Sequence, residues 1–238
     1  MRSRTLKTLA VAAALPLALA ACSSNSDSDP ASASVSASAS DKAKPADPNK
    51  GILTGAALKK ALAPATYFAS GFELDATATR DTGDTYRAPE TTTAKPDCAG
   101  FGGTAWIELT GIKSVSFAQA SYMNKNTTAE LDQEIDAYQG TTSTDVMAAL
   151  KKVVAACPGY TDSDTKSKVK ITGTTTPALG DEAYTITLTS DAWETGTTLI
   201  ASRVGTNVVS VLSTDGPSNG AGGAKKLAEK VVTALKAG

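Results

Sequence analysis

The sequence contains no histidine among its 238 residues, and only 5% of the residues are aromatic. Without histidine the chain cannot build a Ser-His-Asp or Cys-His catalytic centre, an HExxH zinc site or a histidine pH switch. This absence excludes the commonest hydrolase mechanisms. Hydrophobic residues make up 41% of the chain, enough for one modest core. We expect one folded domain without a cofactor.

Long hydrophobic runs are scarce as well, and the one near the N-terminus is short. It extends from Leu9 to Leu19, follows a basic start and precedes small residues and Cys22. This is the layout of an export signal, and the run is too short to span a bilayer as a helix. The LAAC tetrad that ends at Cys22 looks like a bacterial lipobox, which predicts removal of residues 1–21 and lipidation of Cys22. The alternative is an ordinary secretory signal with Cys22 as a bystander.

The stretch 22–50 is rich in serine, alanine, aspartate and proline and has almost no large apolar side chain. Such a composition cannot bury a core and predicts a disordered tether. The folded domain is therefore expected at 51–238, lipid-anchored on the extracytoplasmic face of the cell membrane. Removal of the basic leader leaves an acidic chain, which favours neither nucleic acid nor anionic lipid as a partner.

Cysteine is rare, and its three positions suggest one disulfide. Once Cys22 is lipidated, Cys98 and Cys157 remain for each other, and an exported compartment permits their oxidation. A catalytic thiol is disfavoured because no histidine can activate it. Cys157 ends a predicted amphipathic helix, 144–157, whose first turn has Ser143 or Thr144 as its expected N-cap. The bridge would fasten this helix to the rest of the domain.

The remaining hydrophobic pattern predicts an α+β fold, with an antiparallel sheet of about six strands and helices packed around it. Further helices are expected at 52–62 and 224–237, and a long surface loop at 75–97. The expected strands are 114–124, 129–137, 168–173, 182–190, 197–204 and 207–214.

Segment 129–137 fits both a strand and a helix. It alternates apolar residues with four carboxylates, although Leu131 and Ile135 also fit a helical stripe. The carboxylates are those of Glu130, Asp132, Glu134 and Asp136. They could hold calcium or form an acid/base pair, but same-face residues about 7 Å apart suit a solvated sheet face better. We expect a strand whose acidic side faces water.

Two short motifs carry a family resemblance. The sequences LGDEA at 179–183 and RVGTNVV at 203–209, together with the order of the expected elements, resemble the extracellular sensor domain of the mycobacterial receptor kinase PknH and related actinobacterial lipoproteins. This resemblance implies an antiparallel sheet with helices around a cleft that binds an external ligand, and no catalysis. The kinase sensor has two disulfides, whereas this chain can form one.

The leading hypothesis is a membrane-anchored, non-enzymatic binding or sensor-like domain for a small ligand or an envelope protein. Large aromatic and arginine side chains commonly anchor ligands. The candidates of these types are Trp106, Tyr122, Trp193 and Arg203; no metal ligands are expected. One alternative is an envelope interaction or structural lipoprotein that uses its sheet edge. Another is a hydrolase that uses Asp181 and Glu182, although adjacent strand residues point to opposite faces.

Overall fold

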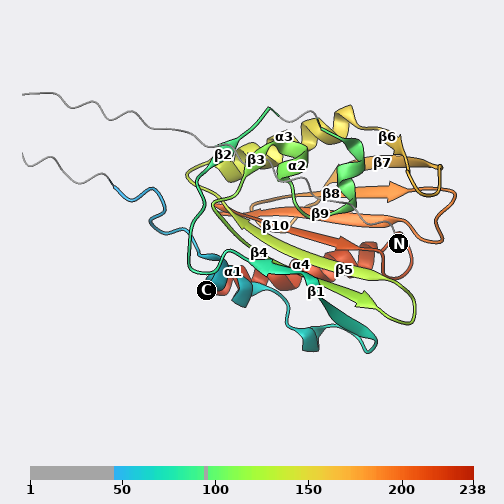
Figure 1. Ribbon diagram of the computed structural model, residues 1–238, viewed down its shortest axis with the longest axis horizontal. Coiled ribbons are helices and arrows are strands. Elements are labelled where there is room, and N and C mark those ends of the chain that lie inside the picture. The colour runs from blue at the N-terminus through green and yellow to red at the C-terminus, as the bar shows by residue number, and fades with distance from the viewer. Residues whose placement is uncertain (1–45, 94–95) are drawn as a thin grey trace, which may run out of the picture. The chain divides into compact units, whose positions relative to one another are not determined.

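The computed structural model describes residues 46–93 and 96–238, so Cys22 and the expected leader and most of the tether lie outside the described residues. Within these ranges the chain forms an α+β fold with one large antiparallel sheet and four α-helices (Figure 1). The large sheet has eight strands in the described part, rather than the six expected, in the order β1-β4-β5-β10-β9-β8-β7-β6. Its strands are β1 (Phe72–Asp81), β4 (Ser116–Asn124), β5 (Glu130–Ala137), β6 (Gly159–Thr161), β7 (Lys168–Thr175), β8 (Glu182–Thr189), β9 (Thr197–Val204) and β10 (Asn207–Ser213).

Helices cover both faces of this sheet. Along β9 and β10, Ile200 and Val209 belong to one hydrophobic cluster, and Ala201 and Val208 belong to another. Because adjacent strand residues point to opposite faces, the two clusters lie on opposite sides of the sheet. The first cluster packs under α1 (Gly55–Ala61) and α4 (Ala221–Ala237), and the second under α3 (Thr142–Ala156), which contacts α2 (Ile107–Thr110).

The helix expected at 144–157 is α3, and its apolar stripe is buried as its spacing predicts. The prediction that Ser143 or Thr144 is the N-cap of this helix is wrong, however. The helix begins at Thr142, and the preceding Thr141 makes no side-chain capping bond. Ser143 lies inside the first turn, where its hydroxyl donates to the carbonyl oxygen of Gly205 at 2.9 Å. This serine therefore ties α3 to the turn between β9 and β10.

The prediction of a surface loop at 75–97 is wrong for the first part of that range, because β1 continues to Asp81. This strand forms one edge of the sheet and pairs only with β4, with an irregularity between Asp75 and Arg80. Most of its side chains are exposed or half-buried, so no hydrophobic alternation marks it in the sequence. After β1 come the short strands β2 (Glu90–Thr91) and β3 (Ile112–Lys113), which pair with each other.

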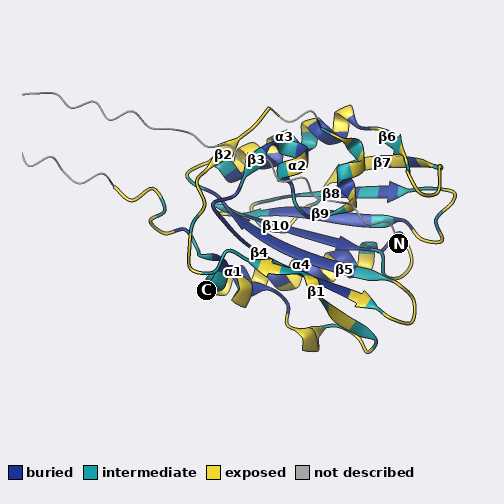
Figure 2. Ribbon diagram, viewed as in Figure 1, coloured by how far each residue is buried: buried dark blue, intermediate teal, exposed yellow. Residues whose placement is uncertain are grey.

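Segment 129–137 is a strand as predicted, but the prediction that its acidic side faces water is wrong. β5 lies between β4 and β10, deep within the sheet, and Figure 2 shows these central strands largely buried. Asp132, Glu134 and Asp136 are all buried, and Glu130 is half-buried. The physical reason is that chain segment 98–114 packs over this face, which the alternation within β5 cannot indicate.

Candidate functional site

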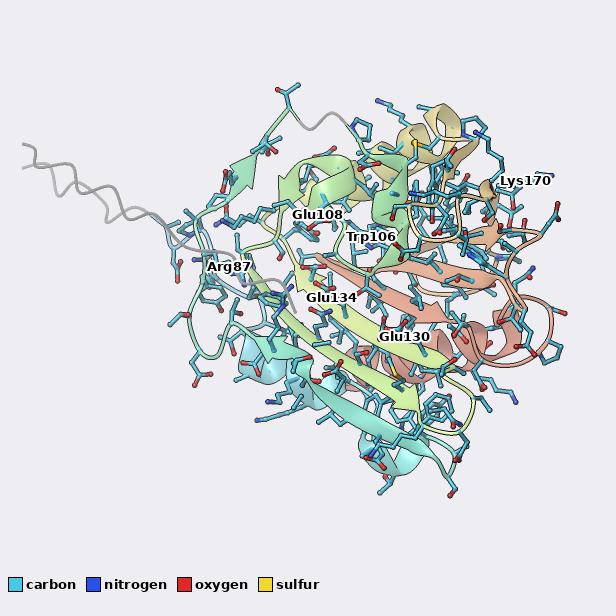
Figure 3. All side chains as sticks on the ribbon, turned by 45° about the vertical axis from the view of Figure 1, so that its right-hand side comes forward. Arg87, Trp106, Glu108, Glu130, Glu134 and Lys170 are labelled. Carbon is cyan, nitrogen blue, oxygen red and sulfur yellow. A yellow bond between two sulfur atoms is a disulfide. The ribbon has the colours of Figure 1, made fainter. Side chains whose placement is uncertain are left out.

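A cavity of about 200 Å³ lies over β4 and β5, beneath the segment that contains α2 and β3. The sheet supplies its floor, and the residues just before α2 supply a wall. Arg80, at the end of β1, and Arg87, in the loop that follows, also line the cavity. Figure 3 labels Arg87, Trp106 and Glu134 among its side chains. The charged and aromatic side chains that line it include Arg80, Arg87, Trp106, Phe117, Glu134 and Asp136.

The wall of the cavity is fastened in two ways. Cys98, in the 3-10 helix η2 (Cys98–Gly102), forms a disulfide with Cys157 at the end of α3, with 5.6 Å between the Cα atoms. The predicted cysteine pair is thus confirmed. Further along, the Thr104 hydroxyl donates to Oε2 of Glu134 at 2.7 Å. The disulfide and this buried hydrogen bond hold the segment that leads to Trp106 against the sheet.

The three buried carboxyl groups of β5 are held in an environment that disfavours their charge. Burial, with a smaller contribution from the neighbouring Asp136, raises the pKa of Glu134 to about 8, against the opposing effects of the Thr104 hydroxyl and of the charges on Arg80 and Arg87. Burial also raises the pKa of Asp136 to about 6 and that of Asp132 to about 7, where Glu130 adds repulsion. At neutral pH Glu134 is therefore mostly protonated.

The opposite side of the cavity is cationic. The guanidinium carbon of Arg87 lies 4.2 Å from the ring centroid of Phe117, and that of Arg80 lies 5.7 Å from it. These distances are those of cation–π contacts, which position both guanidinium groups over the sheet. Arg80 also donates from Nε to Oε1 of Gln119 at 3.1 Å.

The register between β4 and β5 defines where the arginines lie relative to the carboxyl groups. Phe117 and Gln119 of β4 stand opposite Asp136 and Glu134 of β5, so the residues beneath the arginines lie directly beside the carboxyl groups. Within the described residues, neither of these carboxyl groups forms an ion pair. The cavity thus brings cations and acids close without neutralising them.

Several polar atoms around this part of the sheet lack partners. Trp106 is 1% exposed, and its Nε1 atom has no hydrogen-bond partner among the described residues. The same holds for Oδ1 of Asp132 and for Oγ of Ser210, which stands opposite Glu134 on β10. A buried donor or acceptor without a partner costs about 1–3 kcal/mol. Of these three residues, Trp106 is the one that lines the cavity, so its indole N–H is the unpartnered donor beside the site.

The structure does not gather the four aromatic and arginine candidates into one site. Trp106 lines the cavity. Tyr122 lies on the other face of the sheet, where its ring stacks on Phe68 with 3.8 Å between centroids. Trp193 lines a separate open hollow between the loops 126–129, 193–197 and 214–216. Arg203 forms ion pairs with the carboxylates of β8 and its preceding turn.

The carboxylates considered for a hydrolase are engaged in contacts that hold the fold. Asp181 accepts hydrogen bonds from the backbone N–H of Gly205 at 2.8 Å and from Arg203 at 3.1 Å. Glu182 pairs with Lys151 of α3 through a contact of 2.5 Å between Nζ and Oε1. These contacts connect β8, the β9–β10 turn and α3.

The sequence does not indicate that Arg80 and Arg87 line a cavity, and the prediction that the acidic side of β5 faces water is wrong. Arg80 and Arg87 lie in a stretch without periodicity, and nothing local indicates that both stack on Phe117. The alternating carboxylates of β5 were the available signal. Their burial depends on Thr104 and Trp106, which come from a distant part of the chain.

Comparison with protein-family models gives no match for this chain, and comparison with curated proteins gives none either. Within the described ranges, no helix is both long enough and apolar enough to cross a membrane. The same residues contain no group of three or more acidic or cysteine side chains placed to hold a metal ion.

Proposed function

We propose that this protein is a lipid-anchored extracytoplasmic protein whose domain binds a small polar ligand without chemically changing it. The observation that carries the proposal is the cavity over β4 and β5, where charged groups of both signs converge beside an unpartnered indole N–H. A concave site with a few convergent polar groups and perturbed pKa values is the usual form of a ligand site. The resemblance to the PknH sensor domains supports the same function.

Binding accounts for the site better than hydrolysis does. Glu134 and Asp136 are two residues apart on one strand, so both carboxyl groups belong to the floor of the cavity. Glycosidases that depend on two carboxyl groups instead place an acid and a base or nucleophile on either side of the scissile bond. The arginines, rather than a second carboxylate, stand across the cavity from these acids.

The two tryptophans provide a direct test. Trp106 lines the cavity, whereas Trp193 lies at the other hollow, so their two indole N–H signals in a ¹H–¹⁵N spectrum report separate places. The Trp193→Phe variant assigns the signals. We expect at least one class in a panel of sugars, nucleotides, carboxylates, amines, amino acids and short peptides to shift the Trp106 signal in a saturable way and leave the Trp193 signal in place. A Trp106 signal that no class moves would contradict ligand binding at this cavity.

A further inference from the structure

The cavity has an acidic side and a cationic side, and β4 lies between them. Glu134 and Asp136 come from β5, whereas Arg80 comes from the end of β1 and Arg87 from the next loop. The guanidinium groups lie over Phe117 of β4, which stands opposite Asp136, so one strand spacing of about 4.8 Å separates the residue beneath the arginines from the acidic strand. The only other lining cation, Lys113, is paired with Glu90 at 3.1 Å. The two arginines therefore remain as the cations that a ligand can engage.

Among the described residues, neither the buried carboxyl groups nor the exposed guanidinium groups of Arg80 and Arg87 have an ion-pair partner. A buried carboxylate is costly unless a cation or several donors accompany it, and within the described residues Glu134 receives only the Thr104 hydroxyl bond. A guanidinium group presents paired N–H donors that match a carboxylate in a planar, two-pronged contact. An ammonium group on one side and a carboxylate on the other would supply a partner for both.

We propose that the cavity binds a small zwitterion of the α-amino-acid class, with its ammonium group at Glu134 and Asp136 and its carboxylate at Arg80 and Arg87. This inference rests on the proposed function and specifies its ligand class. The lining also has an apolar part, which suits a short apolar side chain; it includes Phe117, Trp106, Ala105, Ile107 and Ile112. The cavity volume of about 200 Å³ restricts the ligand to a free amino acid or a similarly small molecule.

Binding of the ammonium group is coupled to proton release. The ionised form of Glu134 accepts the ammonium group, but burial keeps this carboxyl group mostly protonated at neutral pH because its pKa is about 8. Affinity for the zwitterion therefore rises with pH, by roughly tenfold between about pH 6.5 and pH 8, a range over which free amino acids keep their ammonium charge. A ligand with only a carboxylate would show the opposite dependence. The ionisable groups that line the cavity are Arg80, Arg87, Lys113, Glu134, Asp136 and Tyr138.

The test compares three ligands of the same size on the purified full-length chain: alanine, propionate and ethylamine. Isothermal titration gives each affinity, in buffers of different ionisation enthalpy so that released protons are counted. We expect alanine to bind at least roughly tenfold more tightly than either single-charge analogue, because each analogue lacks the charge-assisted hydrogen bonds of one end of the zwitterion. Phenylalanine, 3-phenylpropionate and phenethylamine repeat the comparison with a larger side chain.

Variants test the contacts of each end of the ligand separately. Glu134→Gln should lower the affinity for alanine toward that for propionate, and Arg80→Gln with Arg87→Gln should lower it toward that for ethylamine. Glu108→Gln is the matched control, since Glu108 is exposed on α2 and does not line the cavity. Circular dichroism on each variant establishes that it is folded before titration.

The outcomes distinguish this inference from the function on which it rests. Propionate binding as tightly as alanine would define an anion site, and ethylamine binding as tightly would define a cation site; either result overturns the zwitterion. If all three ligands fail while another class moves the Trp106 signal, the ligand class is wrong and the binding function stands. A Trp106 signal that no class moves overturns both.

Discussion

At the scale of single residues, Gln133 is a buried polar group with fully defined partners. Its Nε2 atom donates to the carbonyl oxygen of Ala63 at 2.9 Å, and its Oε1 atom accepts the N–H of Ala63 at 2.7 Å. The side chain is completely buried among apolar residues beneath α1. One amide thus satisfies both backbone groups of Ala63, just beyond the end of α1, and fixes that segment on β5.

Replacing Gln133 with leucine should therefore destabilise the protein. The variant keeps a similar volume but leaves the N–H and C=O of Ala63 buried without partners, at a cost of about 2–4 kcal/mol. Urea unfolding followed by circular dichroism measures the change. The control is Gln139→Leu, which removes a partly exposed bond to Asn49 and should cost less than about 1 kcal/mol. Equal losses for the two variants would contradict the role of Gln133.

Some residue roles can be predicted from the sequence because their cause is local. Thr54 immediately precedes the first helix and has a residue type that favours capping, and its hydroxyl oxygen accepts the N–H of Ala57 at 3.3 Å. The predicted N-cap of α3 is wrong because the Ser143 hydroxyl donates to the carbonyl oxygen of Gly205, far away in the chain, and does not cap the helix. The burial of Glu134 was missed for the same reason, since its partner Thr104 is 30 residues away in the chain.

At the scale of elements, strands with one or two apolar faces were predictable, and edge strands were not. β9 and β10 carry clear patterns because apolar residues are buried on both of their faces, and β7 carries one because buried Val169 and Ile171 alternate with exposed residues. β1 and β6 form the two edges of the sheet and bury few side chains, so their sequences resemble loops. An edge strand is defined by hydrogen bonds to one neighbour, a long-range property that periodicity does not record.

The disulfide should stabilise the element that covers the cavity as well as the fold. It joins residues separated by 59 positions, and closing such a loop removes about 4 kcal/mol of unfolded-state entropy in the chain model. We expect the Cys98→Ser, Cys157→Ser double variant to lose most of this stability in urea unfolding. The Trp106 indole signal of the variant should broaden, because Trp106 follows the fastened η2 segment.

Reductant supplies the control for this prediction. It should lower the unfolding midpoint of the wild-type protein and leave that of the double variant unchanged. An unchanged wild-type midpoint after complete reduction, verified by thiol titration, would show that the bridge does not stabilise the domain.

At the scale of the whole molecule, the proposed lipid anchor determines where the domain acts. If Cys22 carries the lipid, Cys22→Ala should move the protein from the membrane fraction to the soluble fraction or leave an unprocessed precursor. Detergent phase partitioning and intact mass measure both results. Cys98→Ser serves as the control, since loss of the disulfide should not release the protein. Unchanged partitioning and mass in the Cys22 variant would contradict lipidation.

The stability of the whole domain should fall as pH rises from mildly acidic to mildly alkaline values. Carboxyl groups have pKa values near 4 in the unfolded chain, whereas burial raises those of Asp136, Asp132 and Glu134 to about 6, 7 and 8 in the folded protein. The folded state therefore binds more protons than the unfolded state, and the free energy of unfolding decreases as pH rises through these values. Hydrogen bonds lower the pKa values of Asp75 and Asp162, but both groups are ionised in either state above about pH 5.

Glu134→Gln isolates the largest part of this effect. The amide keeps the shape of the side chain and can still accept the Thr104 hydroxyl bond, but it does not titrate. At about pH 8.5 the variant should be more stable than the wild-type protein by on the order of a few kcal/mol, and the advantage should shrink toward about pH 5, where the wild-type carboxyl group is protonated. Urea unfolding at a series of pH values measures both curves, with Glu108→Gln as the exposed control whose curve should follow the wild type. Parallel curves for Glu134→Gln and the wild type across this range would mean that Glu134 is not held neutral by burial, and the proton release inferred for ligand binding would then lose its basis.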